Sequence, residues 1–391
     1  QSAGIYATGA SVKTINNSGT ITVGDSITPL NPSIGIYSGN VGDQITSNNI
    51  TAGRNSMGIY STGGQVTQTG VLNIGDTGVG VYLENGSLNI ANTASVNMGT
   101  KIAVVAYTQN SAVTNNINLN IGNDNFGFVV VGGSFANTGS NITLGNDSVY
   151  LVKTGASTVT NASGTTVTIN GSESTAFYGL DNVKFVNDGN ITGTSGYGNL
   201  GIQNIGGTSV NNGNIALGDS AIVDISKSLF TVGMYGENSN MTNSSTGNIS
   251  VGAGAVGMGT ITGSAENLGN ISASGDYSMG MYTERGTVIN RGTINITGSN
   301  IIGMAGNGSG SKVINYGTIR VSGSHAIGMY GLSDSEIING GTIIADGEGA
   351  QGIVLGSGSV LNNLVGGTII INGGDSTGNY GVGSGEVYNT P

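Results

Sequence analysis

The chain has 391 residues, of which 73 are glycine and 37% are hydrophobic, and it contains neither cysteine nor tryptophan. Ten Lys and Arg stand against 21 Asp and Glu, a formal net charge of −11. The few cations are scattered singly, so the clusters that bind nucleic acid or an anionic membrane surface are missing. Absence of cysteine excludes disulfides and thiolate metal sites, and no apolar stretch approaches the ~20 residues of a membrane helix.

Taken in chain order, the first recurring element reads apolar-Gly-apolar-Tyr, and a short copy already stands at Gly4–Tyr6. Its glycines at Gly35, Gly58 and Gly80 are 23 and 22 residues apart. Each copy is expected to form a short strand, because apolar and small residues alternate and turn residues flank them. Full copies are Ile34–Tyr37, Met57–Tyr60, Val79–Tyr82, Val232–Tyr235, Met279–Tyr282 and Ile327–Tyr330, and degenerate copies are Phe126–Phe128, Val256–Gly259 and Ile302–Ala305.

A second element, Asn-x-Gly-Thr/Asn-Ile, runs in step with the first. Its glycines Gly269, Gly292, Gly317 and Gly341 are 23, 25 and 24 residues apart. Apolar and polar residues alternate with period two in segments such as Thr293–Ile296, as strands require. Helical apolar spacing is missing, and so much Gly and Asn would penalise a helix. Two motifs on one period therefore predict a single unit of three short strands and three turns.

These units predict an all-β fold, a right-handed parallel β-helix (three-sided β-solenoid) of about 15 coils of ~24 residues. Inward Ile, Val and Met would fill a narrow core, while Gly and Asn at corners tolerate positive φ. Asparagine side chains in the same turn of successive coils are expected to hydrogen-bond along the stack. Residues 1–391 would form one continuous solenoid segment, and we expect a fragment, because neither terminus carries a capping sequence.

The period breaks in four places, which predicts insertions near residues 25–33, 148–176, 218–231 and 372–380. The first of these contains Pro29 and Pro32. Insertions in solenoids form loops on the coil surface, and surface loops are where binding is concentrated.

The pairing of Gly-Ile-Tyr or Gly-Met-Tyr with Asn-x-Gly-Thr-Ile every ~24 residues resembles the passenger regions of very large type V secreted autotransporters. The likeness is greatest to giant outer-membrane adhesins of oral anaerobic Gram-negative bacteria, and it covers essentially the whole chain. This resemblance implies a right-handed β-helix displayed extracellularly on the bacterial surface. Such proteins are exported and anchored through a C-terminal outer-membrane β-barrel, which we expect to lie outside this chain, and they engage host receptors, glycans or other bacteria. The protease motif of some autotransporters is also missing.

The sequence contains few of the residue types and motifs that catalytic sites need. The only histidine is His325, although nucleophilic triads need one. Gly24–Ser26 and Gly218–Ser220 look like a protease nucleophile segment, yet Gly, Asp and Ser are also common turn residues. Gly252–Gly257 matches a dinucleotide fingerprint, but no helix is expected to follow it. The sequence therefore predicts no catalytic residue and no cofactor.

A polysaccharide-active β-helical enzyme would need clustered carboxylates, often with Ca²⁺. The acids lie mostly one per coil, near turns. One weak oxygen-rich group could form on adjacent coils, and we interpret it as solvated turn residues because Asp and Asn favour turns. It comprises Asn123, Asp124, Asn125, Asn146 and Asp147. We predict no metal site.

The tyrosines form the most interesting constellation. If the apolar residues of each copy point inward, period two sends Gly and Tyr outward. Tyr37, Tyr60 and Tyr82 would then stack on consecutive coils, whereas farther along Tyr235, Gly259, Tyr282, Ala305 and Tyr330 would alternate ring and gap. Aromatic faces are good platforms for sugars and protein partners. We therefore predict binding at Tyr37, Tyr60, Tyr82, Tyr235, Tyr282 and Tyr330. The alternative, which we favour, is a cross-strand ladder that only covers the corner.

The leading hypothesis is an adhesin passenger segment that attaches to host cells or other bacteria without catalysis. Its partner would be a host-cell surface receptor, a glycan or another bacterial surface, and not nucleic acid. A passive stalk of a larger surface protein is the first alternative, and a β-helical polysaccharide-active enzyme is the second.

Overall fold

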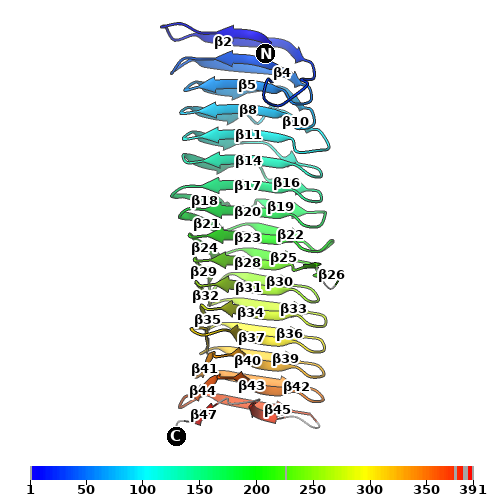
Figure 1. Cartoon of the computed structure of the whole chain (residues 1–391), viewed down its shortest axis with the longest axis vertical. Coiled ribbons are helices and arrows are strands. Elements are labelled where there is room, and N and C mark those ends of the chain that lie inside the picture. The colour runs from blue at the N-terminus through cyan, green and yellow to red at the C-terminus, as the bar shows by residue number, and fades with distance from the viewer. Residues whose placement is uncertain (1, 225–226, 374–376, 382–385, 390–391) are drawn as a thin grey trace. The chain divides into compact units, whose positions relative to one another are not determined.

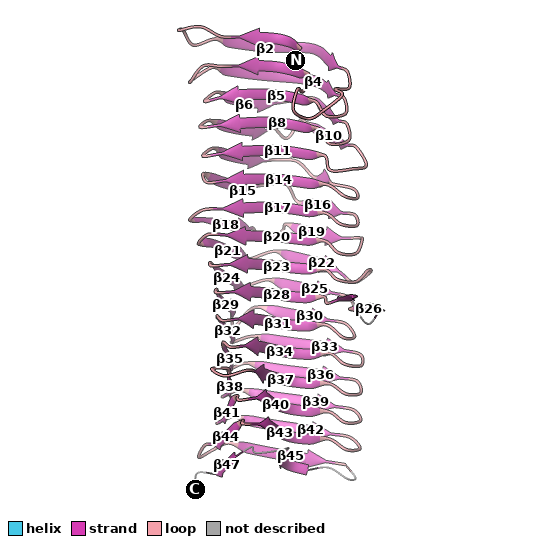
Figure 2. Cartoon of the chain, viewed as in Figure 1, coloured by secondary structure: helices cyan, strands magenta, loops and turns pink. Residues whose placement is uncertain are grey.

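The computed structural model describes residues 2–224, 227–373, 377–381 and 386–389, apart from the side chains of 222–229 and of the residues after 373. The contacts divide the chain into two compact units, Gln1–Phe185 (unit 1) and Val186–Pro391 (unit 2). Every regular element in the described residues is a β-strand (Figures 1 and 2). No helix within these ranges is long and apolar enough to span a bilayer.

Each unit is built from stacked coils, and each coil contributes one strand to each of three faces, except where the two longest strands, β2 and β4, cover two faces. Neighbouring strands on a face pair in parallel with equivalent residues of successive coils in register, for example Ile271 with Ile294 and Ile294 with Ile319. In the described residues this pairing is interrupted between β10 and β13 on face 3 and between β15 and β18 on face 2. In the residues that the structure describes, each unit holds eight strands of face 1. This arrangement confirms the all-β parallel β-solenoid with ~24-residue coils and is consistent with the expected right-handed β-helix.

Face 1 holds the strands of the apolar-Gly-apolar-Tyr element. In unit 1 they are β1 (Ala3–Ala7), β3 (Ile34–Ser38), β5 (Met57–Thr62), β8 (Val79–Glu84), β11 (Val104–Gln109), β14 (Phe126–Val131), β17 (Val149–Thr154) and β20 (Thr175–Leu180). In unit 2 they are β23 (Leu200–Ile205), β28 (Val232–Glu237), β31 (Val256–Ile261), β34 (Met279–Glu284), β37 (Ile302–Asn307), β40 (Ile327–Ser333), β43 (Gln351–Ser357) and β46 (Thr377–Gly381).

Face 2 holds the strand that follows each face 1 strand. In unit 1 it comprises the first parts of β2 (Thr14–Val23) and β4 (Gln44–Ala52), then β6 (Gln65–Gln68), β9 (Ser87–Ile90), β12 (Ala112–Asn115), β15 (Ser134–Asn137) and β18 (Ser157–Asn161). β21 (Val183–Asn187) includes the boundary of the two units. In unit 2 the strands are β24 (Thr208–Asn211), β29 (Asn240–Asn243), β32 (Ser264–Asn267), β35 (Thr287–Asn290), β38 (Lys312–Asn315), β41 (Glu336–Asn339), β44 (Val360–Asn363) and β47 (Glu386–Asn389).

Face 3 completes each coil. In unit 1 it comprises the last parts of β2 and β4, then β7 (Val71–Ile74), β10 (Ser95–Met98), β13 (Leu119–Asn120), β16 (Asn141–Leu144) and β19 (Thr166–Ile169). In unit 2 it comprises β22 (Asn190–Gly193), β25 (Asn214–Leu217), β30 (Asn248–Val251), β33 (Asn270–Ser274), β36 (Thr293–Thr297), β39 (Thr318–Ser322), β42 (Thr342–Asp346) and β45 (Thr368–Asn372).

The core of each unit is a set of inward columns, one residue per coil. In unit 2, Ile271, Ile294 and Ile319 lie one above another on face 3 and are at most 1% exposed. Backbone groups are satisfied between coils, as where the Thr293 amide donates to the Gly269 carbonyl at 2.9 Å. Because each coil covers the apolar residues of the next, the stack needs no helix to close its core.

The orientation that we expected for the apolar-Gly-apolar-Tyr element is wrong in two of its positions. Gly58 is buried, and a Cβ there would lie 3.2 Å from the Leu72 side chain, so the glycine faces the core and not the solvent. Met57, the first apolar residue, is half-buried on the outer side, while Ile59 is fully enclosed. Two consecutive inward residues break strict alternation, in the manner of a bulge, and they leave Tyr60 outward as predicted.

The predicted asparagine ladder is confirmed at the corner between faces 2 and 3. In unit 2 seven consecutive hydrogen bonds run from the Nδ2 of one asparagine to the Oδ1 of the asparagine in the next coil, at 2.7 to 3.0 Å. The ladder runs through Asn187, Asn211, Asn243, Asn267, Asn290, Asn315, Asn339 and Asn363. Buried amides are tolerated here because each inner member of the ladder meets an asparagine in the coil before it and in the coil after it.

Two further features lie where the period is irregular. In unit 1 the core contains an aromatic cluster in which Tyr150 contacts Phe128 and Phe177, and on the same strand as Tyr150, Lys153 is fully buried. In unit 2 an antiparallel hairpin, β26 (Ala221–Asp224) and β27 (Lys227–Leu229), leaves the coil (Figure 1). The expected insertion at 372–380 falls partly outside the described residues.

Candidate functional site

A continuous stack of tyrosine rings lies on face 1 of unit 1. The centroids of Tyr37 and Tyr60 are 5.2 Å apart and those of Tyr60 and Tyr82 5.0 Å, with ring planes within 3°. Tyr6 extends the stack at one end and Tyr107 at the other. These distances confirm the predicted stacking of Tyr37, Tyr60 and Tyr82 on consecutive coils. The rings stack because the rise from one coil to the next is close to an aromatic stacking distance.

Stacking decides which part of each ring can meet a partner. The inner rings have a neighbour on both faces, so they present their edges and hydroxyls to solvent. The Tyr82 hydroxyl donates to Glu84 Oε1 at 2.9 Å, and Gln109 donates to that hydroxyl at 3.3 Å. Burial, together with the hydrogen bond and the charge of Glu84, raises the pKa of Tyr82 to about 12. This surface suits a partner that packs against ring edges more than a sugar that stacks on a ring face.

In unit 2 the tyrosines lie at the same position of the face 1 strand, but every second coil has a small residue. Tyr235, Gly259, Tyr282, Ala305 and Tyr330 are aligned in register, as predicted. Ala305 is fully enclosed and Gly259 is buried. The places between rings are therefore filled rather than open, and Tyr235, Tyr282 and Tyr330 belong to a closed apolar surface. No contact in the structure tests whether the six tyrosines bind a partner, so that stays a prediction.

A second outward column runs beside the tyrosines in unit 1, and sequence reasoning missed it. It consists of the first apolar residue of each element, which we expected to point inward. These side chains are half-buried on the outer side of face 1: Met57, Val79, Val104, Phe126 and Val149. Face 1 thus presents two parallel apolar columns to solvent.

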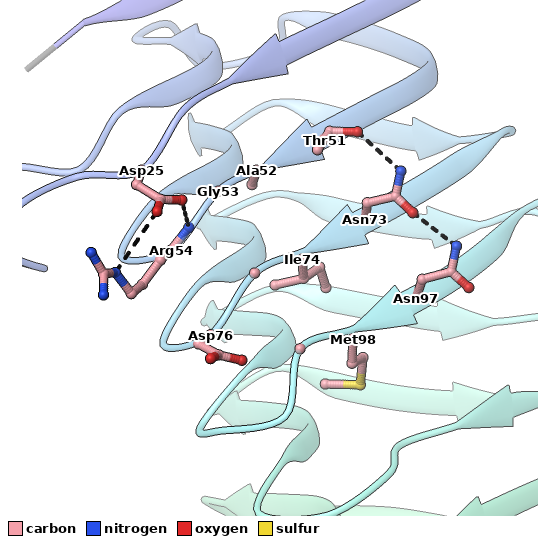
Figure 3. A pocket seen from close by; sticks show the side chains of 12 residues that line it. Asp25, Thr51, Ala52, Gly53, Arg54, Asn73, Ile74, Asp76, Asn97 and Met98 are labelled. Atoms are coloured by element: carbon pink, nitrogen blue, oxygen red, sulfur yellow. Dashed lines mark hydrogen bonds and ion pairs between the residues drawn. The ribbon is translucent and has the colours of Figure 1, made fainter.

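Face 3 of unit 1 has a hollow of about 560 Å³, shown in Figure 3. One side is an outward polar row in which Asn97 donates to Asn73 at 2.8 Å and Asn73 donates to Thr51 at 3.0 Å. On the other side the Asp25 carboxylate accepts a hydrogen bond from the backbone amide of Arg54 at 2.8 Å, and it lies 3.9 Å from the Nε of the Arg54 side chain. The residues could hold a polar ligand through amides and hydroxyls, and no sequence motif marked them.

The acids and amides that an enzyme might have used hold neighbouring coils together. Asp219 accepts the Ala253 amide at 2.8 Å, as Asp25 accepts that of Arg54. Asn123 accepts the Asn146 amide at 2.9 Å and Asn146 accepts that of Ser172 at 2.8 Å. In the described part of the chain no group of three or more His, Cys, Asp or Glu could hold a metal ion.

Comparison with known proteins adds one match. Residues 218–339 match a family model described as the BigA third pectate lyase-like domain. The match covers β26 to β41, that is, the stacked coils of unit 2 that contain Tyr235, Tyr282 and Tyr330. No curated protein matches the chain. The match and the parallel solenoid are both consistent with a β-helix in this segment.

Proposed function

We propose that this chain is an adhesive segment of a protein displayed on a bacterial surface, and that it attaches to host cells or other bacteria without catalysis. The observation that carries the proposal is the outer side of face 1. Two of its outward columns are mainly apolar or aromatic, although the core is already filled by inward residues such as Ile59 and Val81. Contiguous exposed apolar surface commonly marks an interaction site.

Charge supports contact through apolar surface rather than through ionic attraction. Several cations on the described surface already pair with acids of neighbouring coils, as Arg291 does with Glu266 and Lys312 with Glu336. Such exposed pairs stabilise weakly, but they leave little positive charge for a polyanionic partner. Attachment that depends on face 1 should therefore change little as salt is raised, because screening acts mainly on charges.

The proposal is tested by coating beads with the whole chain and counting beads attached to a panel of epithelial cells and oral bacteria. The face 1 variant carries Tyr60→Ser and Tyr82→Ser. The matched control carries Thr67→Ala and Thr114→Ala, which lie on the outer side of face 2. We expect the face 1 variant to lose at least about tenfold in attachment, the change that ~1.4 kcal/mol produces, while the control behaves as wild type. Equal attachment of all three would contradict the proposal.

A passive stalk is the second candidate, and the unbroken amide ladder of unit 2 favours it. Eight asparagines linked in series tie coil to coil, which suits a segment that transmits force or sets a distance. Wild-type beads that attach to no cell in the panel would support the stalk. Release of sugar from polysaccharide by the purified chain would instead support the enzyme alternative.

A further inference from the structure

The strand ladder on face 3 of unit 1 is interrupted. β10 pairs with β7 residue for residue, from Ser95 with Val71 to Met98 with Ile74. β13 is only two residues long and pairs with β16. No ladder joins β10 to β13 among the described residues of unit 1, so two coils that are neighbours in the stack separate on this face.

The corner before β10 explains the separation. Two residues join β6 to β7, whereas four residues, 91–94, join β9 to β10. Ile90 also occupies the corner position that Gln68 and Asn115 take in the adjacent coils. An isoleucine cannot continue an amide ladder, and the buried Asn115 Oδ1 is left without a hydrogen bond. The longer corner and the missing amide together let β10 part from the coil that follows.

The separation of the two coils exposes apolar side chains at the bottom of the cleft between them. Val96 and Met98 are half-buried, although their counterparts in the preceding coil, Leu72 and Ile74, are 0% and 3% exposed. The cleft is a hollow of about 220 Å³ that also contacts Asn120 and Ile121. It continues into a second hollow of about 460 Å³ through shared Val96 and Asn120. Neither hollow is lined by a charged side chain.

The outward polar row ends at the same place. Asn97 Nδ2 donates to Asn73 Oδ1 at 2.8 Å, but Asn97 Oδ1 accepts no hydrogen bond within the described residues. Across the cleft, Asn120 Oδ1 accepts the Thr143 hydroxyl at 3.1 Å and the Gly122 amide at 3.3 Å. The Asn120 Nδ2 makes no hydrogen bond to the described chain. A continuous ladder would have joined these two groups, so the break leaves one free acceptor and one free donor above an apolar floor.

We propose that this cleft binds a pyranose unit of a neutral glycan, a ligand class that deepens the proposed adhesive function and rests on it. A pyranose has an apolar C–H face, which fits Val96 and Met98, and hydroxyls that donate to Asn97 Oδ1 and accept from Asn120 Nδ2. Small-ligand sites combine apolar lining with a few polar groups of this kind. An acidic sugar would have no cation to pair with in the cleft, and the chain carries a net charge of −11.

The test titrates the whole chain by calorimetry with cellotetraose, chitotetraose and maltotetraose, with tetragalacturonate as the acidic comparison. The site variant is Asn97→Ala. Its matched control is Asn295→Ala, the same exposed strand position in β36, where the ladder is continuous on both sides. We expect at least one neutral tetrasaccharide to bind, Asn97→Ala to weaken it about tenfold, and the control to bind as wild type.

Three outcomes would overturn the assignment. They are no binding of any neutral sugar, equal binding by Asn97→Ala and wild type, or stronger binding of tetragalacturonate than of neutral sugars. Failure here is distinguishable from failure of the adhesive function, because bead attachment is lost through Tyr60→Ser and Tyr82→Ser on face 1. Beads that attach through face 1 while the chain binds no sugar would refute the cleft alone.

Discussion

Removal of one rung of the buried amide ladder should destabilise unit 2 strongly. The change is Asn267→Ala, in the middle of the ladder. Asn267 Nδ2 donates to Asn290 Oδ1 at 2.8 Å and to two carbonyl oxygens at 3.3 Å, while its Oδ1 accepts Asn243 Nδ2 at 2.8 Å. All three asparagines are 0% exposed, so water cannot replace the lost partner.

The size of the destabilisation depends on which hydrogen bonds the neighbouring asparagines keep. Asn243 Nδ2 keeps two carbonyl acceptors at 3.2 Å, so its loss is partial. Asn290 Oδ1 loses the donor that the coil before it supplied. An orphaned buried polar atom costs about 1–3 kcal/mol, and each net hydrogen bond lost costs about 1 kcal/mol. We expect the free energy of unfolding to fall by about 3 kcal/mol.

The control is Asn295→Ala, a side chain on the outer side of face 3 in the next coil. An exposed substitution of this kind should change the unfolding free energy by less than about 0.5 kcal/mol. Urea unfolding followed by circular dichroism measures both variants. Native-state hydrogen exchange of β32 to β36 shows whether the loss is local, because solenoid coils can open separately. A value for Asn267→Ala within about 0.5 kcal/mol of wild type would refute the reasoning.

Three further predictions concern titratable groups. Burial and Glu84 raise the pKa of Tyr82 from 10.0 to about 12. The contribution of Tyr82 to stability is therefore present below pH 10.0 and is lost as pH rises through about 12. Absorbance titration should show a lower pKa of Tyr82 in the Glu84→Gln variant. Burial lowers the pKa of Lys153 below 10.5, so the free energy of unfolding should rise as the pH approaches 10.5. In the Lys153→Met variant the midpoint of urea unfolding should no longer rise with pH in this range. Burial tends to raise the pKa of Asp43, but hydrogen bonds from Ser38, the Lys13 amide and Asn40 lower it below 3.8 overall, so its stabilisation is lost as pH falls through that lowered pKa. Ser38→Ala should make acid unfolding begin at higher pH, and an unchanged onset would count against this network.

Most of the fold could be predicted from the repeat period of the sequence. The nearly equal spacing of Gly35, Gly58 and Gly80, 23 and 22 residues, indicates similar coils, and similar coils bring equivalent residues into register. For that reason the asparagine ladder and the tyrosine stack could both be predicted from residue positions alone. Each depends only on which residue recurs once per coil, and not on how the chain bends between strands.

Details inside one coil escaped prediction because strict alternation does not hold there. Gly58 and Ile59 both face the core, so an assignment by period two placed the glycine and the first apolar residue on the wrong sides. The cleft beside β10 arises from two extra corner residues and one Ile90, a change too small to disturb the period. Lys153 is buried at a position that other coils give to residues such as Ser61 and Leu83, which no repeat could reveal.

The central claim is that the outer side of face 1 makes the adhesive contact, and chemical footprinting of tyrosines tests it most directly. The whole chain is nitrated with and without bound cells, and each tyrosine is quantified by mass spectrometry. Tyr277 lies in a turn and is 70% exposed, so it serves as an internal reference. We predict protection of Tyr60 and Tyr82 with Tyr277 unchanged. Protection of Tyr277 with Tyr60 and Tyr82 modified as in the free chain would contradict the account.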